Sequence, residues 1–181
     1  MRGFSFLEIL LALALIAILG AISVPSICDL VRRNAVLTRV DRIANTLQFV
    51  RTAAIGRAEL VIFCKSKDQK QCKDAGVLWS DGQIVVAVND RGEQKLLQVV
   101  ETLPIGDILE WHSNFSQNES LGFLPSGTTN GQHGSFYYCS RNHPQYSRAI
   151  IVNENGRVYV SDKTAEGEAI RCSEEILNFK L

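Results

Sequence analysis

The first pattern in the sequence is a long apolar run near its start. Between Phe4 and Ile27 the only charged residue is Glu8. As a helix, these 24 residues would span roughly 36 Å, enough to cross a hydrocarbon core of about 30 Å. A carboxylate within such a segment costs roughly 2.5 kcal/mol or more at mid-bilayer, and the nearby sequence offers it no partner. The run therefore predicts a transmembrane helix in which Glu8 has a function.

A cleaved signal peptide and a simple anchor helix are the two alternatives for this run. A signal peptide would have a longer basic region before the apolar core, a shorter core, and a small-x-small cleavage site after it. Here only residues 1–3 precede the core, and residues 24–26 fit such a site poorly. Both alternatives are therefore less favoured than a membrane helix with a functional acid.

Beyond Asp29 the apolar pattern becomes periodic. Apolar residues recur at spacings of three and four, which predicts a single stripe along an amphipathic helix. Gly56 is a reasonable C-terminal stop, so residues 4–56 predict one helix of roughly 80 Å. We interpret the arginines on the other faces as a solvated face or as contacts to neighbouring molecules rather than a nucleic-acid site. The stripe consists of Val36, Val40, Ile43, Leu47, Val50 and Ala54.

Pro25 lies inside the helical run, where it removes one backbone hydrogen bond. Two interpretations remain open. Pro25 either ends the membrane segment or allows a kink or local unwinding of a longer helix.

After the helix the apolar pattern has a period of two, which is typical of strands. Short apolar segments alternate with turn sequences such as residues 89–92 and 153–156. These segments predict an α+β fold in which an antiparallel β domain packs on the apolar stripe of the helix. One predicted strand forms the second part of a turn-and-strand segment at 76–88. The other predicted strands cover 60–64, 96–100, 108–111, 121–124, 135–139, 148–152 and 157–161.

Length and charge limit the remaining possibilities. The chain has 181 residues, which leaves room for one globular domain of about 125 residues after the helix. Lysine plus arginine and aspartate plus glutamate both number 19, so the formal net charge is zero. This balance argues against strong nonspecific attraction to nucleic acid.

The cysteines indicate the compartment. Four of the five lie in the globular part, and Cys28 lies at the membrane boundary. We favour the pairs Cys64–Cys72 and Cys139–Cys172, because each closes a local unit and neither has the C-x-x-C spacing of a metal site. A tetrahedral zinc site is the alternative. Disulfides would place the domain in an oxidising compartment, periplasmic or extracellular.

The sequence contains little that indicates catalysis. The three histidines are scattered, and there is neither a glycine-rich phosphate loop nor a serine nucleophile elbow. Cys139 and His143 lie close in sequence, but such a pair alone specifies no catalytic geometry. We therefore expect no enzyme activity, cofactor, bound metal or small-molecule substrate.

The N-terminal stretch carries a family resemblance. Residues 3–8, Gly-Phe-Ser-Phe-Leu-Glu, followed by an Ala/Leu/Ile helix and Pro25, resemble the class III signal of type IV pilins and pseudopilins. The resemblance implies that a prepilin peptidase cuts after Gly3 and that Phe4 is then N-methylated. It also implies that Glu8 pairs with the N-terminal amine of a neighbouring subunit, and that Pro25 marks where the helix loosens in a filament. The three-residue leader is shorter than is usual in the family.

Motifs farther along resemble the GspH/FimT-type domain of minor type IV pilins and of a minor pseudopilin of type II secretion. They are a strand ending in cysteine, Trp-Ser-Asp-Gly at 79–82, Phe-Leu-Pro-Ser-Gly at 123–127 and Gly-Arg-Val at 156–158. The resemblance implies a leader at 1–3, a transmembrane segment at 4–27, an amphipathic segment at 28–57 and a periplasmic domain at 58–181.

The function implied by the resemblance is that of a minor type IV pilin. Such a protein is a single-pass protein of the inner membrane before it enters a pilus, where it primes assembly or forms part of the tip. Its partners would be other major and minor pilins or pseudopilins, the prepilin peptidase and the inner membrane.

Two alternatives belong to the same resemblance. One is a minor pseudopilin of type II secretion, and the other is a DNA-binding minor pilin for natural transformation. Some family members carry Gly-Arg-x-Arg at the C-terminal hairpin, where this chain has Arg157 and, in place of the second arginine, Tyr159. Arg141 and Arg148 could add phosphate contacts, and Tyr159 could stack on a base. Residues 139–181 contain six basic and six acidic residues, so we favour a structural role for Arg157.

Overall fold

The computed structural model describes residues 5–72, 76–113 and 120–172, without the side chains of Ile22 and Pro25. The chain divides into two compact units, Met1–Ala35 and Val36–Leu181. The second unit begins inside the amphipathic segment expected at 28–57. It does so because the apolar stripe joins the core of the sheets from Val36 onward.

Helix α1 (Phe6–Arg57) covers almost the whole predicted helix and passes through Pro25 without a break. It begins where the carbonyl oxygen of Ser5 accepts the backbone N–H groups of Glu8 and Ile9. It ends before Ala58, whose φ of 53° is incompatible with continuing a right-handed helix. The first part of α1 is long and apolar enough to cross a membrane, and its most apolar window is uncovered within the described residues.

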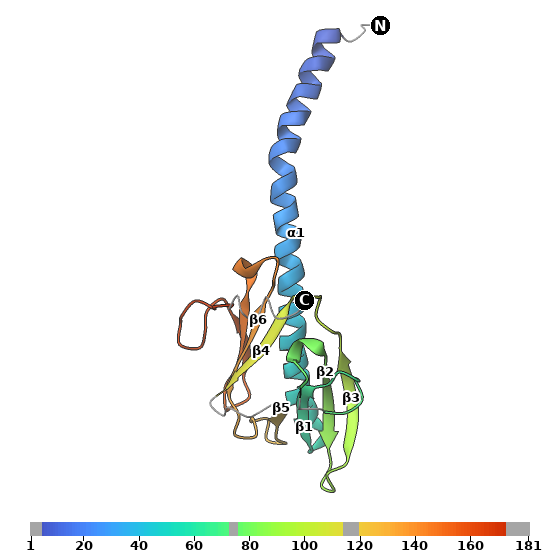
Figure 1. Cartoon of the computed structure of the whole chain (residues 1–181), viewed down its shortest axis with the longest axis vertical. Coiled ribbons are helices and arrows are strands. Elements are labelled where there is room, and N and C mark those ends of the chain that lie inside the picture. The colour runs from blue at the N-terminus through green and yellow to red at the C-terminus, as the bar shows by residue number, and fades with distance from the viewer. Residues whose placement is uncertain (1–4, 73–75, 114–119, 173–181) are drawn as a thin grey trace. The chain divides into compact units, whose positions relative to one another are not determined.

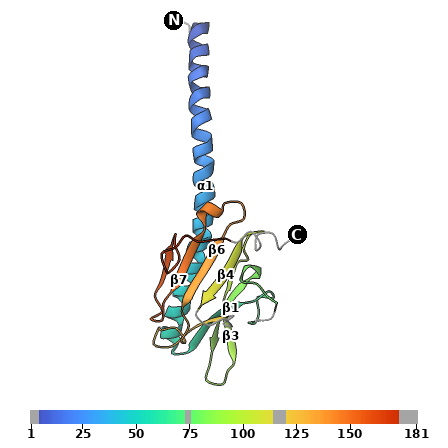
Figure 2. The ribbon, with the colours of Figure 1, turned by 60° about the vertical axis from the view of Figure 1, so that its left-hand side comes forward.

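The second unit contains two antiparallel four-stranded sheets (Figures 1 and 2). The first has the order β3-β2-β1-β5, from β1 (Leu60–Lys65), β2 (Gln83–Val88), β3 (Gln94–Val100) and β5 (Ser120–Phe123). The second has the order β4-β6-β7-β8, from β4 (Ile108–Ser113), β6 (Gly134–Cys139), β7 (Arg148–Val152) and β8 (Val158–Ser161). Short 3₁₀ turns, η1 (Trp79–Asp81) and η2 (Pro144–Tyr146), precede β2 and β7.

One hydrophobic core joins α1 to both sheets. All six residues of the predicted stripe are buried in it, together with inward-facing residues of β1, β2, β5, β6 and β7. An aromatic group fills its centre: Phe63 stacks on Trp79 at 5.2 Å, and Phe136 meets both rings edge-on. The α+β architecture predicted from the periodicity is confirmed.

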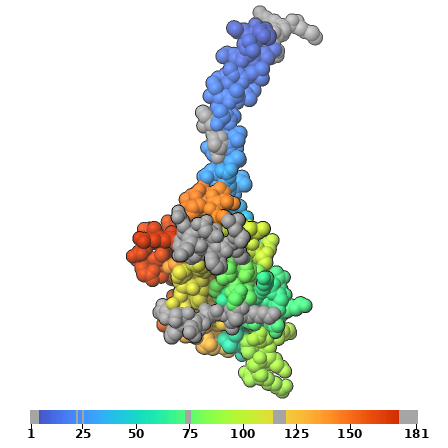
Figure 3. All heavy atoms as spheres, in the orientation of Figure 1, coloured from blue at the N-terminus to red at the C-terminus, as the bar shows by residue number. Residues whose placement is uncertain are grey.

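The predicted strands are present with small differences at their ends. The hairpin turn at 89–92 joins β2 to β3 and projects from the domain surface (Figure 3). The last strand begins at Val158 rather than Arg157, because the backbone N–H of Arg157 is bonded to the Asn153 side chain of the turn. The division into two sheets, with β5 paired to β1, has no counterpart in the pattern of the sequence.

Candidate functional site

Of the N-terminal residues singled out, Gly3 and Phe4 lie outside the described residues, and Glu8 lies in the first turn of α1. The Glu8 side chain is exposed, and within the described residues its carboxylate has no hydrogen-bond or ion-pair partner. The apolar residues beside it, such as Phe6 and Leu7, are also exposed, at 77% and 76%. This end of the helix thus presents an apolar surface with a single carboxylate on it.

A buried carboxylate ties α1 to the sheet β4-β6-β7-β8. Asp107 precedes β4 and is only 7% exposed. Its Oδ1 accepts a hydrogen bond from Ser140 Oγ at 3.0 Å, and its Oδ2 accepts from the Tyr138 hydroxyl and from Arg39 Nη1, the latter at 3.3 Å. The three donors come from β6, the residue following it, and α1. This Asp107 cluster was not singled out in the sequence, because the three donors lie 31 to 68 residues from Asp107.

Because of the Asp107 cluster, the free energy of unfolding is expected to fall at alkaline pH. Burial raises the pKa of Tyr138 far above its ordinary value of 10.0, the bond to Asp107 and its charge raise it further, and Arg39 partly opposes them. The folded state therefore keeps a proton that the unfolded state loses above pH 10.0. Below pH 10.0 the contribution of Tyr138 to stability is fully present. As the pH rises from there toward the pKa of Tyr138 in the folded state, the free energy of unfolding falls by up to about 1.4 kcal/mol per pH unit.

The test compares the free energy of unfolding of the full chain with that of Tyr138→Phe, both in detergent micelles. We expect a difference that is constant at neutral pH and shrinks once the pH exceeds the ordinary tyrosine pKa. A difference that stayed constant through strongly alkaline pH would show that Tyr138 titrates normally.

A second cluster brings together two motifs of the family resemblance. Arg51 of α1 donates from Nε to the carbonyl oxygen of Gly127 at 2.9 Å, and Gly156 lies against the same carbonyl. The two turns are joined by a bond from the Thr129 N–H to the Glu154 carbonyl at 3.0 Å. The Pro-Ser-Gly turn and the Gly-Arg-Val turn are thus packed on each other and on α1, which gives both glycines a structural role.

Gly156→Ala is expected to destabilise the domain by roughly 3 kcal/mol or more. A Cβ at this position would lie 2.1 Å from the Gly127 oxygen, and φ is +73°. Gly92 is a matched control, because its φ is +78° and nothing lies within 4 Å of a Cβ built on it. Gly92→Ala should therefore cost only the backbone strain, about 1 kcal/mol. Equal losses of unfolding free energy, measured in urea, would contradict the proposed clash.

The four residues considered for DNA binding do not form one surface. Arg157 is exposed in the turn before β8, with its guanidinium 5.9 Å from the centre of the Tyr159 ring. Arg148 begins β7, at the opposite end of that strand from the turn that holds Arg157, and donates to the Ser147 carbonyl. Arg141 lies beyond β6 at the Arg148 end of the sheet, with its side chain against Gly106.

Acidic residues lie near the same hairpin. The Glu154 carboxylate is 3.1 Å from His133 Nδ1. Burial raises the pKa of Tyr137, and the negative charges of Glu166 and Glu168 raise it further, which places both glutamates near the outer face of β6. Of the four candidates, the structure pairs only Arg157 and Tyr159, in surroundings that also carry negative charge.

The cysteines are paired as the sequence analysis favoured. Cys64 is bonded to Cys72 and Cys139 to Cys172, whereas Cys28 is free and exposed. The four paired cysteines therefore supply no thiolate to a metal. Within the described residues no group of three or more His, Cys, Asp or Glu side chains is arranged to hold a metal ion.

A helix that starts with an uncovered apolar segment and ends packed on two antiparallel sheets defines a protein of the pilin class. The family model described as "Type II transport protein GspH" matches residues 39–156, and the chain belongs to this family. The family comprises minor pilins and pseudopilins, which are structural proteins and not enzymes.

Two crystal structures of one minor pilin share this fold. A crystal structure of the type IV minor pilin FimU of Pseudomonas aeruginosa is similar, with a TM-score of 0.56 and 17% identity, over 75% of this chain and 96% of FimU. A second crystal form of FimU has a TM-score of 0.54 and 18% identity, over 72% of this chain and 98% of FimU. For the minor pseudopilin EpsH of Vibrio cholerae, the TM-score is 0.49 and the identity 12%, over 69% of this chain and 94% of EpsH. A comparison with curated proteins gives no significant match.

Proposed function

We propose that this chain is a minor type IV pilin. A prepilin peptidase would cut it after Gly3, and Phe4 would become the methylated N-terminus of a subunit that enters a pilus. The observation that carries the proposal is the uncovered apolar segment of α1 with Glu8 as its single, unpartnered carboxylate within the described residues. In lipid such a carboxylate is costly unless a positive charge neutralises it.

A second subunit supplies that charge in the proposed filament. The N-terminal amine created by cleavage before Phe4 would pair with Glu8 of a neighbour, so each subunit neutralises another. Before assembly the same segment anchors the protein in the inner membrane, with the disulfide-bonded domain in the periplasm. We place the subunit among those that prime assembly or form the tip.

The test is one deletion strain scored for three phenotypes: surface pili, exoprotein release and DNA uptake. Loss of pili, restored by the wild-type gene, is the expected result. Intact pili with blocked exoprotein release would assign the chain to a type II secretion pseudopilus instead. Loss of DNA uptake alone, reproduced by Arg157→Gln, would assign it to natural transformation.

Mass spectrometry of the membrane-extracted protein tests the processing step. The expected mature chain begins at N-methylated Phe4. A chain that began at Met1, or after Ser26, would overturn the filament role.

A further inference from the structure

Strand β3 is the outer strand of the sheet β3-β2-β1-β5, and within the described residues no strand pairs with its free side (Figure 1). Along an edge strand, alternate N–H and C=O groups point away from the sheet and are available to another strand. The free edge of β3 therefore offers a row of backbone donors and acceptors.

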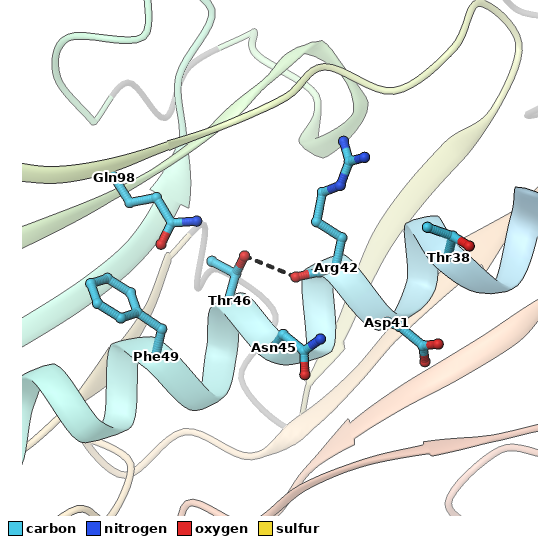
Figure 4. Close-up of a pocket in the computed structure, with 7 residues that line it drawn as sticks. All are labelled: Thr38, Asp41, Arg42, Asn45, Thr46, Phe49 and Gln98. Carbon is cyan, nitrogen blue, oxygen red and sulfur yellow. Dashed lines mark hydrogen bonds between the residues drawn. The ribbon is translucent and has the colours of Figure 1, made fainter.

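A groove of about 470 Å³ runs beside this edge. Six residues of α1 between Thr38 and Phe49 form one wall, and Gln98 of β3 lies across from them (Figure 4). The Gln98 side chain points from the strand toward α1, near Phe49 and Thr46 (Figure 4). The groove is thus bounded by a helix on one side and by the edge of a sheet on the other, an arrangement that can hold an extended peptide.

Apolar side chains border both faces of the edge. On the side of α1, Phe49 is 40% exposed. On the outer face of the sheet, Leu96 and Val99 are each 42% exposed. Leu96 pairs with Val86 and Val99 with Ile84, and these two partners form a second, smaller apolar cluster with Cys64. The register shift between Val85 and Val86 puts Leu96 and Val99 on one face despite their spacing. A strand added beside β3 would cover apolar surface with both sets of its side chains.

Polar groups in the groove narrow the choice of occupant. Within the described residues, the side chains of Asp41, Asn45 and Gln98 have no hydrogen-bond or ion-pair partner. The amides suit the backbone of a peptide, and the Asp41 carboxylate suits a basic side chain. At the Val100 end, an ion pair between Arg42 and Glu101 joins α1 to the segment after β3 and bounds the groove.

We propose that the β3 edge is a strand-addition site for an extended segment of a partner protein. An antiparallel segment would run in the direction of α1, from Asp41 toward Phe49. These residues are eight apart on the helix, about 12 Å, which four strand residues span. The segment therefore carries a basic residue and, four positions later, an apolar one. A charged residue on an edge strand, here Lys95, and a register shift both disfavour pairing with any exposed strand. We therefore expect β3 to pair only with a segment of this pattern.

The probe is the peptide acetyl-Lys-Val-Thr-Val-Leu-amide, added to the full chain in detergent micelles. Its lysine and leucine face the groove, and its two valines face Leu96 and Val99. At saturating peptide we expect the free-side amides of β3 to exchange hydrogen about tenfold or more slowly, while those of β8, the outer strand of the other sheet, are unchanged. This experiment needs no filament, so its failure is separate from failure of the pilin proposal.

Three controls decide whether binding is strand addition. The same peptide N-methylated at alternate residues, and a version with glutamate for lysine, should bind at least about tenfold more weakly. Phe49→Ala should weaken binding about tenfold, and the matched change Ile55→Ala, at a 50% exposed residue of α1 that does not line the groove, should not. No slowing at β3, equal binding of the methylated peptide, or equal effects of the two variants would overturn the proposal.

Discussion

Glu8→Ala is expected to reduce incorporation into pili by at least about tenfold while leaving the protein in the membrane. The change removes the only charge from the apolar segment, so insertion of the isolated subunit becomes easier rather than harder. In the filament, however, the amine of a neighbour would then lie in apolar surroundings without a counter-charge, at a cost of roughly 2.5 kcal/mol or more. The measurement compares the amounts of subunit in sheared pili and in the membrane fraction.

Two further variants separate charge from size. Glu8→Gln keeps the length of the side chain and removes its charge, so it should fail as alanine does. Glu8→Asp keeps the charge on a shorter side chain and should retain part of the incorporation. Normal incorporation of the glutamine variant would show that Glu8 does not act as a counter-charge.

Asp107→Ala is expected to lower the free energy of unfolding by about 3 kcal/mol, because it leaves two buried hydroxyl groups without their acceptor. Tyr138 is fully buried and Ser140 is 3% exposed, so water does not readily replace the lost carboxylate. The loss corresponds to a fall in Tm of roughly 6–12 °C. Tryptophan fluorescence of the full chain, in micelles, reports the transition, because Trp79 lies in the core and Trp111 packs against it.

Glu101→Ala is the matched control, since Glu101 also pairs with an arginine of α1. Its side chain is 71% exposed and that of Arg42 is 47% exposed, so the pair is screened by water and should contribute less than about 1 kcal/mol. Similar losses in the two variants would mean that Asp107 acts as an ordinary surface ion pair.

Local pattern was sufficient to predict the elements of this fold. The spacing of Val36, Val40 and Ile43 predicted which face of the helix is buried, and each of them is at most 1% exposed. The hairpin around the turn at 153–156 was also predicted, because alternating residues and a turn sequence lie next to each other in the chain. These features depend on residues a few positions apart, which is the range over which sequence periodicity acts.

Contacts between distant segments were not predictable in the same way. Neither the link between Arg39 and Asp107 nor the contact of Arg51 with Gly127 leaves a periodic signal, since the partners are 68 and 76 residues apart. The arginines considered together for DNA binding are close in sequence but lie at opposite ends of β7. The groove beside β3 likewise arises only when a strand at the edge of its sheet comes to lie beside α1.

The sequence by itself determined the apolar segment with its single acid, the amphipathic continuation of the helix and the class of the domain. It could do so because hydrophobic burial follows helix and strand periods that are written into neighbouring residues. Only the tertiary structure decided the sheet order, the buried Asp107 cluster, the packing of the two glycine turns and the free edge of β3. Those features depend on which segments meet after the chain has folded, and many sheet orders satisfy the same local pattern equally well.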